Sequence, residues 1–120
     1  MERELIHMFH NSGWQPIRAS GSGNTTLPCV DLLAGKNGRS LAIECKGGKK
    51  ARYIKRKQIE ELKEFSRKFG AEAWLGARFD NTEWLFLEIE HLKISKSGDN
   101  FVIDPKLAKE KGLKFEELIG

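Results

Sequence analysis

Cysteine is scarce in this chain of 120 residues. Only Cys29 and Cys45 are present, and they form no CxxC pair, so we expect no disulfide framework and a reducing, intracellular setting. No apolar run approaches the roughly 18 residues that a membrane span requires. The charged opening stretch over residues 1–4 does not resemble a signal peptide. We therefore expect a cytoplasmic protein with no membrane segment.

Internal repeats, low-complexity linkers and signs of a second domain are also missing, and the length is typical of one domain. We therefore predict a single domain over residues 1–120. Hydrophobic periodicity and turn residues predict a mixed α/β fold, with one central sheet flanked by helices. The predicted elements are helices over residues 1–12 and 55–69, strands over 14–18, 30–34, 41–46, 73–79 and 84–89, a loop over 19–28, a hairpin turn over 35–39 and a last turn over 115–119.

One segment of strongly one-signed charge stands out. Residues 46–57 read KGGKKARYIKRK, with seven basic residues and no acidic one, in a chain whose net charge is +4. Such a segment repels itself unless water or a polyanion neutralises it, which favours a nucleic-acid surface. The alternative is a solvated basic loop that leads into the following helix.

Two carboxylates and one lysine are expected to meet at a strand end. Side chains alternate along a strand, so Glu44 and Lys46 share one face while Cys45 points to the other. Pairing through the turn over residues 35–39 can bring Asp31 beside them. The alternative is an ordinary surface strand with alternating Glu and Lys.

A divalent cation would relieve the repulsion between these carboxylates. Mg²⁺ prefers carboxylate, carbonyl and water oxygens, so we predict Asp31 and Glu44 as ligands and the carbonyl of Cys45 as a further ligand. No neighbouring thiolate or imidazole supports zinc. A metal held there can bind a scissile phosphate and acidify a water, while Lys46 orients that water or offsets charge on the phosphate.

An ordered series of short motifs resembles the archaeal Holliday-junction resolvases, which belong to the PD-(D/E)xK nuclease superfamily. The resemblance covers roughly residues 2–86, and the tail after Ile89 shows none. It rests on Glu2-Arg3-Glu4-Leu5, Gly13-Trp14, Arg18, Gly21-Ser22-Gly23, Asp31-Leu32-Leu33-Ala34-Gly35, Ile43-Glu44-Cys45-Lys46 and Phe65-Ser66-Arg67-Lys68-Phe69-Gly70.

The resemblance implies a restriction-endonuclease-like fold and a homodimer that makes paired nicks near the branch point of a four-way DNA junction, with Mg²⁺ or Mn²⁺. It implies catalytic and metal-binding roles for Glu2, Asp31, Glu44 and Lys46, and phosphate contacts for Arg3 and Arg18. It also implies a catalytic role for the serine of the family's glycine-rich loop, which matches Ser22 best, with Ser20 close by. Together with the basic run, the predicted DNA-binding residues are Arg3, Arg18, Ser20, Lys49, Lys50, Arg52, Lys55 and Arg56.

The chain departs from the family pattern at two points. Val30 stands where a proline often precedes the aspartate, and Met1 directly precedes Glu2, where family members usually carry a short basic arm. We expect little effect from the first departure, and either a weaker grip on the junction or merely a different start site from the second.

Apolar residues on the helix over residues 55–69 fill the core or face a second copy, and Phe65 and Phe69 are the first choice for a dimer interface. The aromatic residues Trp74, Trp84 and Phe86 are interpreted as ordinary strand residues, although each is able to stack on a base. Two competing functions remain: a nuclease of the same superfamily that acts on linear or damaged duplex DNA, and a non-catalytic junction-binding module.

Overall fold

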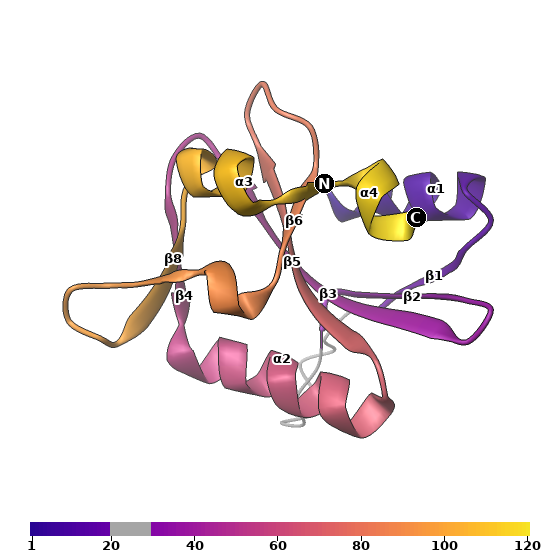
Figure 1. Cartoon of the computed structure of the whole chain (residues 1–120), viewed down its shortest axis with the longest axis horizontal. Coiled ribbons are helices and arrows are strands. Elements are labelled where there is room, and N and C mark those ends of the chain that lie inside the picture. The colour runs from indigo at the N-terminus through magenta and orange to yellow at the C-terminus, as the bar shows by residue number, and fades with distance from the viewer. Residues whose placement is uncertain (20–29) are drawn as a thin grey trace.

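A computed structural model describes residues 1–19 and 30–120 of the chain, and these residues form two sheets flanked by helices (Figure 1). The described elements are α1 (Glu2–Asn11), β1 (Gln15–Arg18), β2 (Leu32–Lys36), β3 (Arg39–Gly48), β4 (Arg52–Lys55), α2 (Arg56–Phe69), β5 (Glu72–Phe79), β6 (Leu85–Leu87), the 3-10 turn η1 (Ile89–His91), β7 (Lys93–Ile94), β8 (Asn100–Ile103), α3 (Pro105–Lys111), β9 (Leu113–Lys114) and α4 (Phe115–Ile119).

The larger sheet has six strands in the order β1-β2-β3-β5-β6-β9. Its strand pairs are antiparallel except for β3 and β5, which run parallel over the whole of β5. A parallel pair needs a crossover connection, and here β4 and α2 provide it. The predicted mixed sheet flanked by helices is therefore confirmed.

A two-residue turn sets the register of the hairpin between β2 and β3. Asn37 and Gly38 both have positive φ, at 49° and 85°, as a type I′ turn requires. This turn places Leu32 opposite Ile43. The hairpin expected over residues 35–39 is therefore confirmed, although β3 extends two residues beyond Lys46.

The larger sheet separates two apolar cores. Leu41, Ile43 and Cys45 of β3 are buried in the core beneath α1 and α4, which lie side by side in Figure 1. Ala42 lies in the other core, together with Ile59 of α2. This second core also contains side chains of the small sheet and of α3. Past Ala42, the strand face on the α2 side continues with Glu44 and Lys46, so this face becomes charged toward the end of β3.

The smaller sheet, with the order β4-β8-β7, was not predicted. Its strands contain four residues or fewer, and β4 lies inside the basic run that we interpreted as a possible loop. The strand predicted over 84–89 is also too long, because β6 ends at Leu87 and Ile89 begins η1. The tail, expected to hold one last turn, contains α3 and β9 as well as α4.

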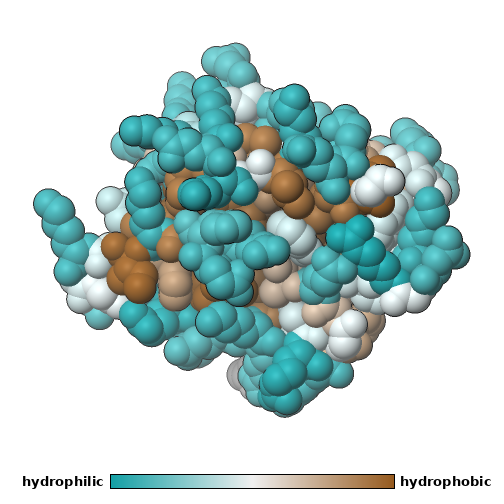
Figure 2. Space-filling model, viewed as in Figure 1, coloured by the Kyte–Doolittle hydropathy of each residue, from teal (hydrophilic) through white to brown (hydrophobic). Residues whose placement is uncertain are grey.

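The surface is mostly hydrophilic on the face shown in Figure 2, with apolar side chains visible between the charged ones. Within residues 1–19 and 30–120, no helix is long and apolar enough to cross a membrane.

Candidate active site

Asp31 lies one residue before β2, where the pairing of β2 with β3 stops. The register puts it opposite Glu44, on the same face of the sheet. Its Oδ2 accepts a hydrogen bond from the backbone N–H of Cys45 at 2.8 Å. Its own carbonyl accepts one from the N–H of Ala19 at 3.0 Å, which ties it to the end of β1. The Asp31 carboxylate therefore accepts the hydrogen bond that a backbone carbonyl of β2 would otherwise accept from the N–H of Cys45. This bond holds the carboxylate against β3.

Glu44 and Lys46 lie on the α2 side of β3, as the strand alternation predicted. Their side chains are only 17% and 15% exposed, and Lys46 Nζ lies 3.9 Å from Glu44 Oε2. The expected grouping of Asp31, Glu44 and Lys46 is therefore present. An ordinary surface strand would leave such side chains mostly in water, so the alternative of a simple Glu–Lys alternation does not fit this burial.

The electrostatics of the cluster are unfavourable to negative charge. Burial, followed by the charge of Asp31, raises the pKa of Glu44 from its ordinary 4.5 to about 7. The hydrogen bond between the Glu44 and Asp31 carboxyls acts in the same direction, whereas Lys46 opposes it. A carboxyl group whose pKa lies near neutral pH is typical of a functional site, because an ion pair with a purely structural role would lower the pKa instead.

The side chain of Cys45 faces away from this cluster. It is buried in the core beneath α1, and burial together with the nearby carboxylates raises the pKa of its thiol far above the ordinary range. The thiol is therefore a packed neutral group. Its backbone is different: the N–H and C=O of one strand residue point to the same side, so the carbonyl of Cys45 faces the side on which Asp31 binds its N–H.

Glu2 approaches the cluster from the start of α1. Its negative charge raises the pKa of both Glu44 and Cys45. Its Oε2 binds Arg18 at 3.2 Å, so these two predicted residues are joined in one ion pair at the rim of the site. Arg3 is exposed on α1. Ser20, Ser22 and Cys29 lie outside the described residues.

The donor atoms around Asp31 suit a hard cation. Within the described ranges, no three His, Cys, Asp or Glu side chains converge as a metal site by themselves. Two carboxylates and a main-chain carbonyl leave room for water, which Mg²⁺ retains in most protein sites. The repulsion between Asp31 and Glu44, visible in the raised pKa of Glu44, is what a bound cation would relieve. The residues present therefore fit Mg²⁺ better than zinc.

The predicted DNA-binding cations of the basic run divide into two groups. Arg52 donates a hydrogen bond to the carbonyl of Gly47, and Arg56 donates one to the carbonyl of Gly98 at 2.7 Å and lies over the ring of Phe101. These two arginines hold the small sheet in place. Lys49, Lys50 and Lys55 are exposed and form no ion pair within the described part of the chain, so they are the cations open to a ligand.

Gly47, next to Lys46, was missed as a site residue. A Cβ atom built there would lie 2.4 Å from the carbonyl oxygen of Arg78 and 2.7 Å from Met1 Sδ. Only glycine allows β3 to lie so close to β5 at this point. The two consecutive glycines directly after Lys46 were the available signal.

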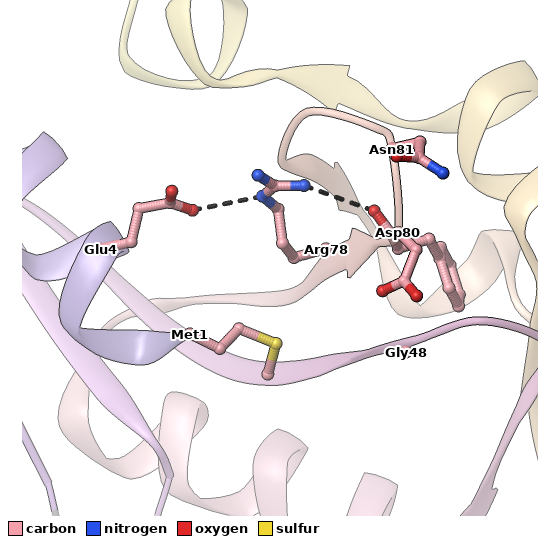
Figure 3. A pocket seen from close by; sticks show the side chains of 7 residues that line it. Met1, Glu4, Gly48, Arg78, Asp80 and Asn81 are labelled. Carbon is pink, nitrogen blue, oxygen red and sulfur yellow. Dashed lines mark hydrogen bonds and ion pairs between the residues drawn. The ribbon is translucent and has the colours of Figure 1, made fainter.

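A pocket of about 570 Å³ lies at the same end of the sheet (Figure 3). Arg78 and Glu4 point toward each other across it and form an ion pair at 3.2 Å. Arg78 pairs in register with Gly47, the residue after Lys46. Because side chains alternate along a strand, the side chain of Arg78 lies on the opposite face of the sheet from that of Lys46. The hydrogen bond from Trp84, and then that from Arg78, lowers the pKa of Glu4. This pocket is therefore behind the carboxylate cluster and separate from it.

The three aromatic residues that we considered able to stack on a base are covered. Trp74, Trp84 and Phe86 are at most 7% exposed, so none of them is open to a base. Their interpretation as ordinary strand residues is confirmed for Trp74 in β5 and Phe86 in β6, and Trp84 directly precedes β6. On α2, Phe65 is half-buried and Phe69 is 56% exposed, with their rings stacked at 5.6 Å.

A mixed sheet that carries two carboxylates and a lysine on one face, at the ends of adjacent strands, defines a nuclease of the restriction-endonuclease-like class. The family model described as "Archaeal holliday junction resolvase (hjc)" matches residues 1–120. The chain therefore belongs to the archaeal Holliday junction resolvase family. The match includes the tail after Ile89, in which the sequence alone showed no resemblance.

Individual relatives agree with this assignment. The chain is 39% identical over 120 residues to the crossover junction endodeoxyribonuclease Hjc of Methanocaldococcus jannaschii, covering 99% of this chain and 84% of the relative. It is 34% identical to the Hjc of Archaeoglobus fulgidus, covering 99% and 86%. A solved structure of the Archaeoglobus fulgidus Hjc superposes with a TM-score of 0.88 at 31% identity, covering 99% of this chain and 97% of that one.

Proposed function

We propose that residues 1–120 act as one nuclease domain that resolves four-way DNA junctions by paired nicks near the branch point. The observation that carries the proposal is the cluster of Asp31, Glu44 and Lys46, half-buried on one face of the sheet in a chain of this family. The relatives are named crossover junction endodeoxyribonucleases, which supports a junction as the substrate.

In this proposal Asp31, Glu44 and the carbonyl of Cys45 would hold Mg²⁺, with Mn²⁺ as a substitute. When bound, such an ion supplies a Lewis acid for the scissile phosphate and lowers the pKa of a water. The ammonium of Lys46 lies beside Glu44, and therefore next to the proposed metal ligands. From there its positive charge offsets negative charge on the phosphate as the P–O bond breaks. Glu2 adds a carboxylate at the rim, where Arg18 fixes its position. The resemblance assigns a catalytic role to Ser22 as well.

Contacts to phosphates along the arms of the DNA junction would come from the exposed lysines Lys49, Lys50 and Lys55, and from Arg3 and Arg18 at the rim of the candidate active site. Each such contact releases counterions and adds affinity without reading sequence. A compact domain with these contacts fits structure-selective cutting, because sequence readout needs side chains that reach base edges.

We further propose that the working unit is a homodimer, since a four-way junction needs two symmetric cuts and one chain carries one carboxylate cluster. An apolar patch at the end of α2 is the proposed interface. Phe69 lines a pocket of about 290 Å³ with Ile17 and Leu33, beside the edge strand β1. Ile17 and Phe69 are 55% and 56% exposed, an unusual amount of apolar surface for one corner of a small domain.

The interface is tested by sedimentation of wild type and Phe69→Glu at micromolar concentration. We expect wild type to sediment as a dimer and the Phe69→Glu variant as a monomer. Ile94→Glu is a matched control, because Ile94 is 59% exposed but lies on β7 of the small sheet. A dimeric Phe69→Glu variant would place the interface elsewhere, and a monomeric wild type that still makes paired nicks would refute the dimer.

The substrate is tested by a panel of a four-way junction, a linear duplex of the same sequence and a single strand, with Mg²⁺ or with EDTA. We expect metal-dependent cleavage of the junction alone. Cleavage of the linear duplex at a similar rate would favour a general nuclease of the superfamily. Junction binding without cleavage would favour a non-catalytic module.

A further inference from the structure

Tyr53 is the only tyrosine of the chain, and it lies 65% exposed on β4. Within the described residues, only Phe69 is another aromatic residue with most of its side chain open, and Phe69 stacks on Phe65. The side chain of Tyr53 has no hydrogen bond or ring contact within the described part of the chain, whereas its backbone lies in the ladder opposite Val102. An exposed aromatic ring held on a strand is a contact surface at little entropic cost, because few torsions remain to be fixed.

The strand that carries Tyr53 is rigidly attached to the end of the catalytic strand. Arg52, its neighbour, donates a hydrogen bond to the carbonyl of Gly47, the residue after Lys46. Ile54, on its other side, is fully buried in the core beneath α2. All four residues of β4 pair with β8. Because side chains alternate, Tyr53 points away from the core that Ile54 enters.

The surroundings of Tyr53 are cationic. Lys49, Lys50 and Lys55 are exposed on either side of it along the chain. Across the small sheet, Tyr53 lies opposite Val102, and Val102 lies opposite Lys93 on β7. The carboxylate of the acidic neighbour Asp104 already has partners. It caps α3 by accepting a hydrogen bond from the N–H of Leu107 at 2.7 Å, and its other oxygen lies 3.9 Å from Lys93 Nζ. A polyanion with exposed aromatic faces is the occupant that matches this combination of charge and ring.

We propose that Tyr53 is a specificity-determining residue that stacks on a nucleobase at the branch of the junction; this inference rests on the proposed function. In a continuous duplex both faces of each base are covered by its neighbours. At a branch point the stack is interrupted, so a base face becomes available to a protein ring. The lysines around Tyr53 bind phosphates of any DNA, whereas the ring gains only where a base face is open.

The test compares wild type, Tyr53→Ala and Tyr53→Phe in binding to a four-way junction and to a linear duplex, each at several salt concentrations. We expect Tyr53→Ala to lose junction affinity by about 5- to 150-fold, the range found when one base–aromatic stack is removed. Duplex affinity and the salt dependence should stay unchanged, because no cation is lost. Tyr53→Phe should behave as wild type, since it keeps the ring.

A fluorescent base analogue at the branch gives an independent readout. Its emission should change on binding of wild type and Tyr53→Phe but not of Tyr53→Ala, and unchanged thermal unfolding of Tyr53→Ala excludes misfolding. Unchanged junction affinity, an equal loss on duplex, or an equal loss in Tyr53→Phe would each overturn the proposal, the last by indicating a hydroxyl–phosphate contact. A monomeric Tyr53→Ala would overturn it too, because a second copy would then cover the ring. Wild type that shows no preference for the junction would instead refute the proposed function.

Discussion

Removing the charge of Glu44 should stabilise the metal-free protein at neutral and alkaline pH. The carboxyl is only 17% exposed, and burial with the charge of Asp31 raises its pKa from 4.5 to about 7. The folded protein therefore holds this proton over a pH range in which the unfolded chain has released it. Because the folded state binds more protons there, stability falls as the pH rises from about 4.5 to about 7 and then levels off.

The size of this loss follows from the same values. At about 1.4 kcal/mol for each pH unit, the interval from 4.5 to about 7 corresponds to about 3.5 kcal/mol. In a domain of this length, about 4 °C in melting temperature accompanies each kcal/mol, which gives roughly 14 °C. The Glu44→Gln variant lacks the titration and keeps a hydrogen-bonding group toward Asp31. It should therefore melt near wild type at about pH 4 and roughly 14 °C higher at about pH 8.

Thermal unfolding in EDTA, followed by circular dichroism between those pH values, measures the difference directly. Glu110→Gln on α3 is a matched control, because Glu110 is exposed and outside the cluster. Adding Mg²⁺ near pH 8 should raise the melting temperature of wild type and not that of Glu44→Gln. Parallel pH profiles for wild type and Glu44→Gln in EDTA would refute the reasoning, since Glu44 would then be an ordinary solvated carboxylate.

Three further outcomes are expected. Asp31→Asn should lower junction cleavage by at least about 10²-fold while leaving junction binding nearly intact, because it removes an anionic ligand and no phosphate contact; binding lost in parallel with cleavage would contradict this. Replacing Lys49, Lys50 and Lys55 together by glutamine should lower the slope of log affinity against log salt by about 2.7, at about 0.9 for each phosphate contact; an unchanged slope would mean that these lysines are merely solvated. Gly47→Ala should destabilise the protein by about 1–3 kcal/mol in denaturant titrations, because its Cβ would lie 2.4 Å from a carbonyl oxygen of β5; wild-type stability would show that the two strands separate easily.

The geometry of the cluster was predictable because it depends on local rules. An Asn-Gly turn fixes the register of a hairpin, and strand alternation then determines which side chains share a face. Counting outward from Asn37 and Gly38 places Asp31 opposite Glu44 before any tertiary contact is considered. The helices α1 and α2 were predictable for a similar reason, since apolar spacing and a following glycine mark each of them.

The small sheet was not predictable from such rules. Its strands are too short to show a period, and β4 buries only Ile54 among exposed polar and aromatic residues. The helix α3 did carry a signal, because Asp104 caps it and Pro105 occupies its first turn. That signal lacked support, since only Leu107 and Ala108 of α3 are buried.

Exposure of aromatic residues depends on partners that are distant in the sequence. Phe86 is covered because α4, at the far end of the chain, brings Phe115 against it. Trp84 is covered in part because its indole N–H donates to Glu4 of α1 at 2.6 Å. Periodicity within one strand contains neither fact, so the sequence did not indicate which aromatic side chain would be exposed, and Tyr53 was overlooked.

The position of the basic run directly after the Glu44–Lys46 strand has a topological reason. Since β3 and β5 are parallel, the chain must leave the carboxylate end of β3 and return to the opposite end of the sheet before β5 begins. The first residues of that return path therefore lie next to the candidate active site. They lie on the face of the sheet that the crossover covers. Here the crossover covers the α2 face, which also carries Glu44 and Lys46. If DNA binds as proposed, with its phosphate backbone across the carboxylates, cations and an aromatic ring on β4 and its preceding turn would be within reach of it, whereas the same residues in the hairpin between β2 and β3 would lie at the far end of the sheet.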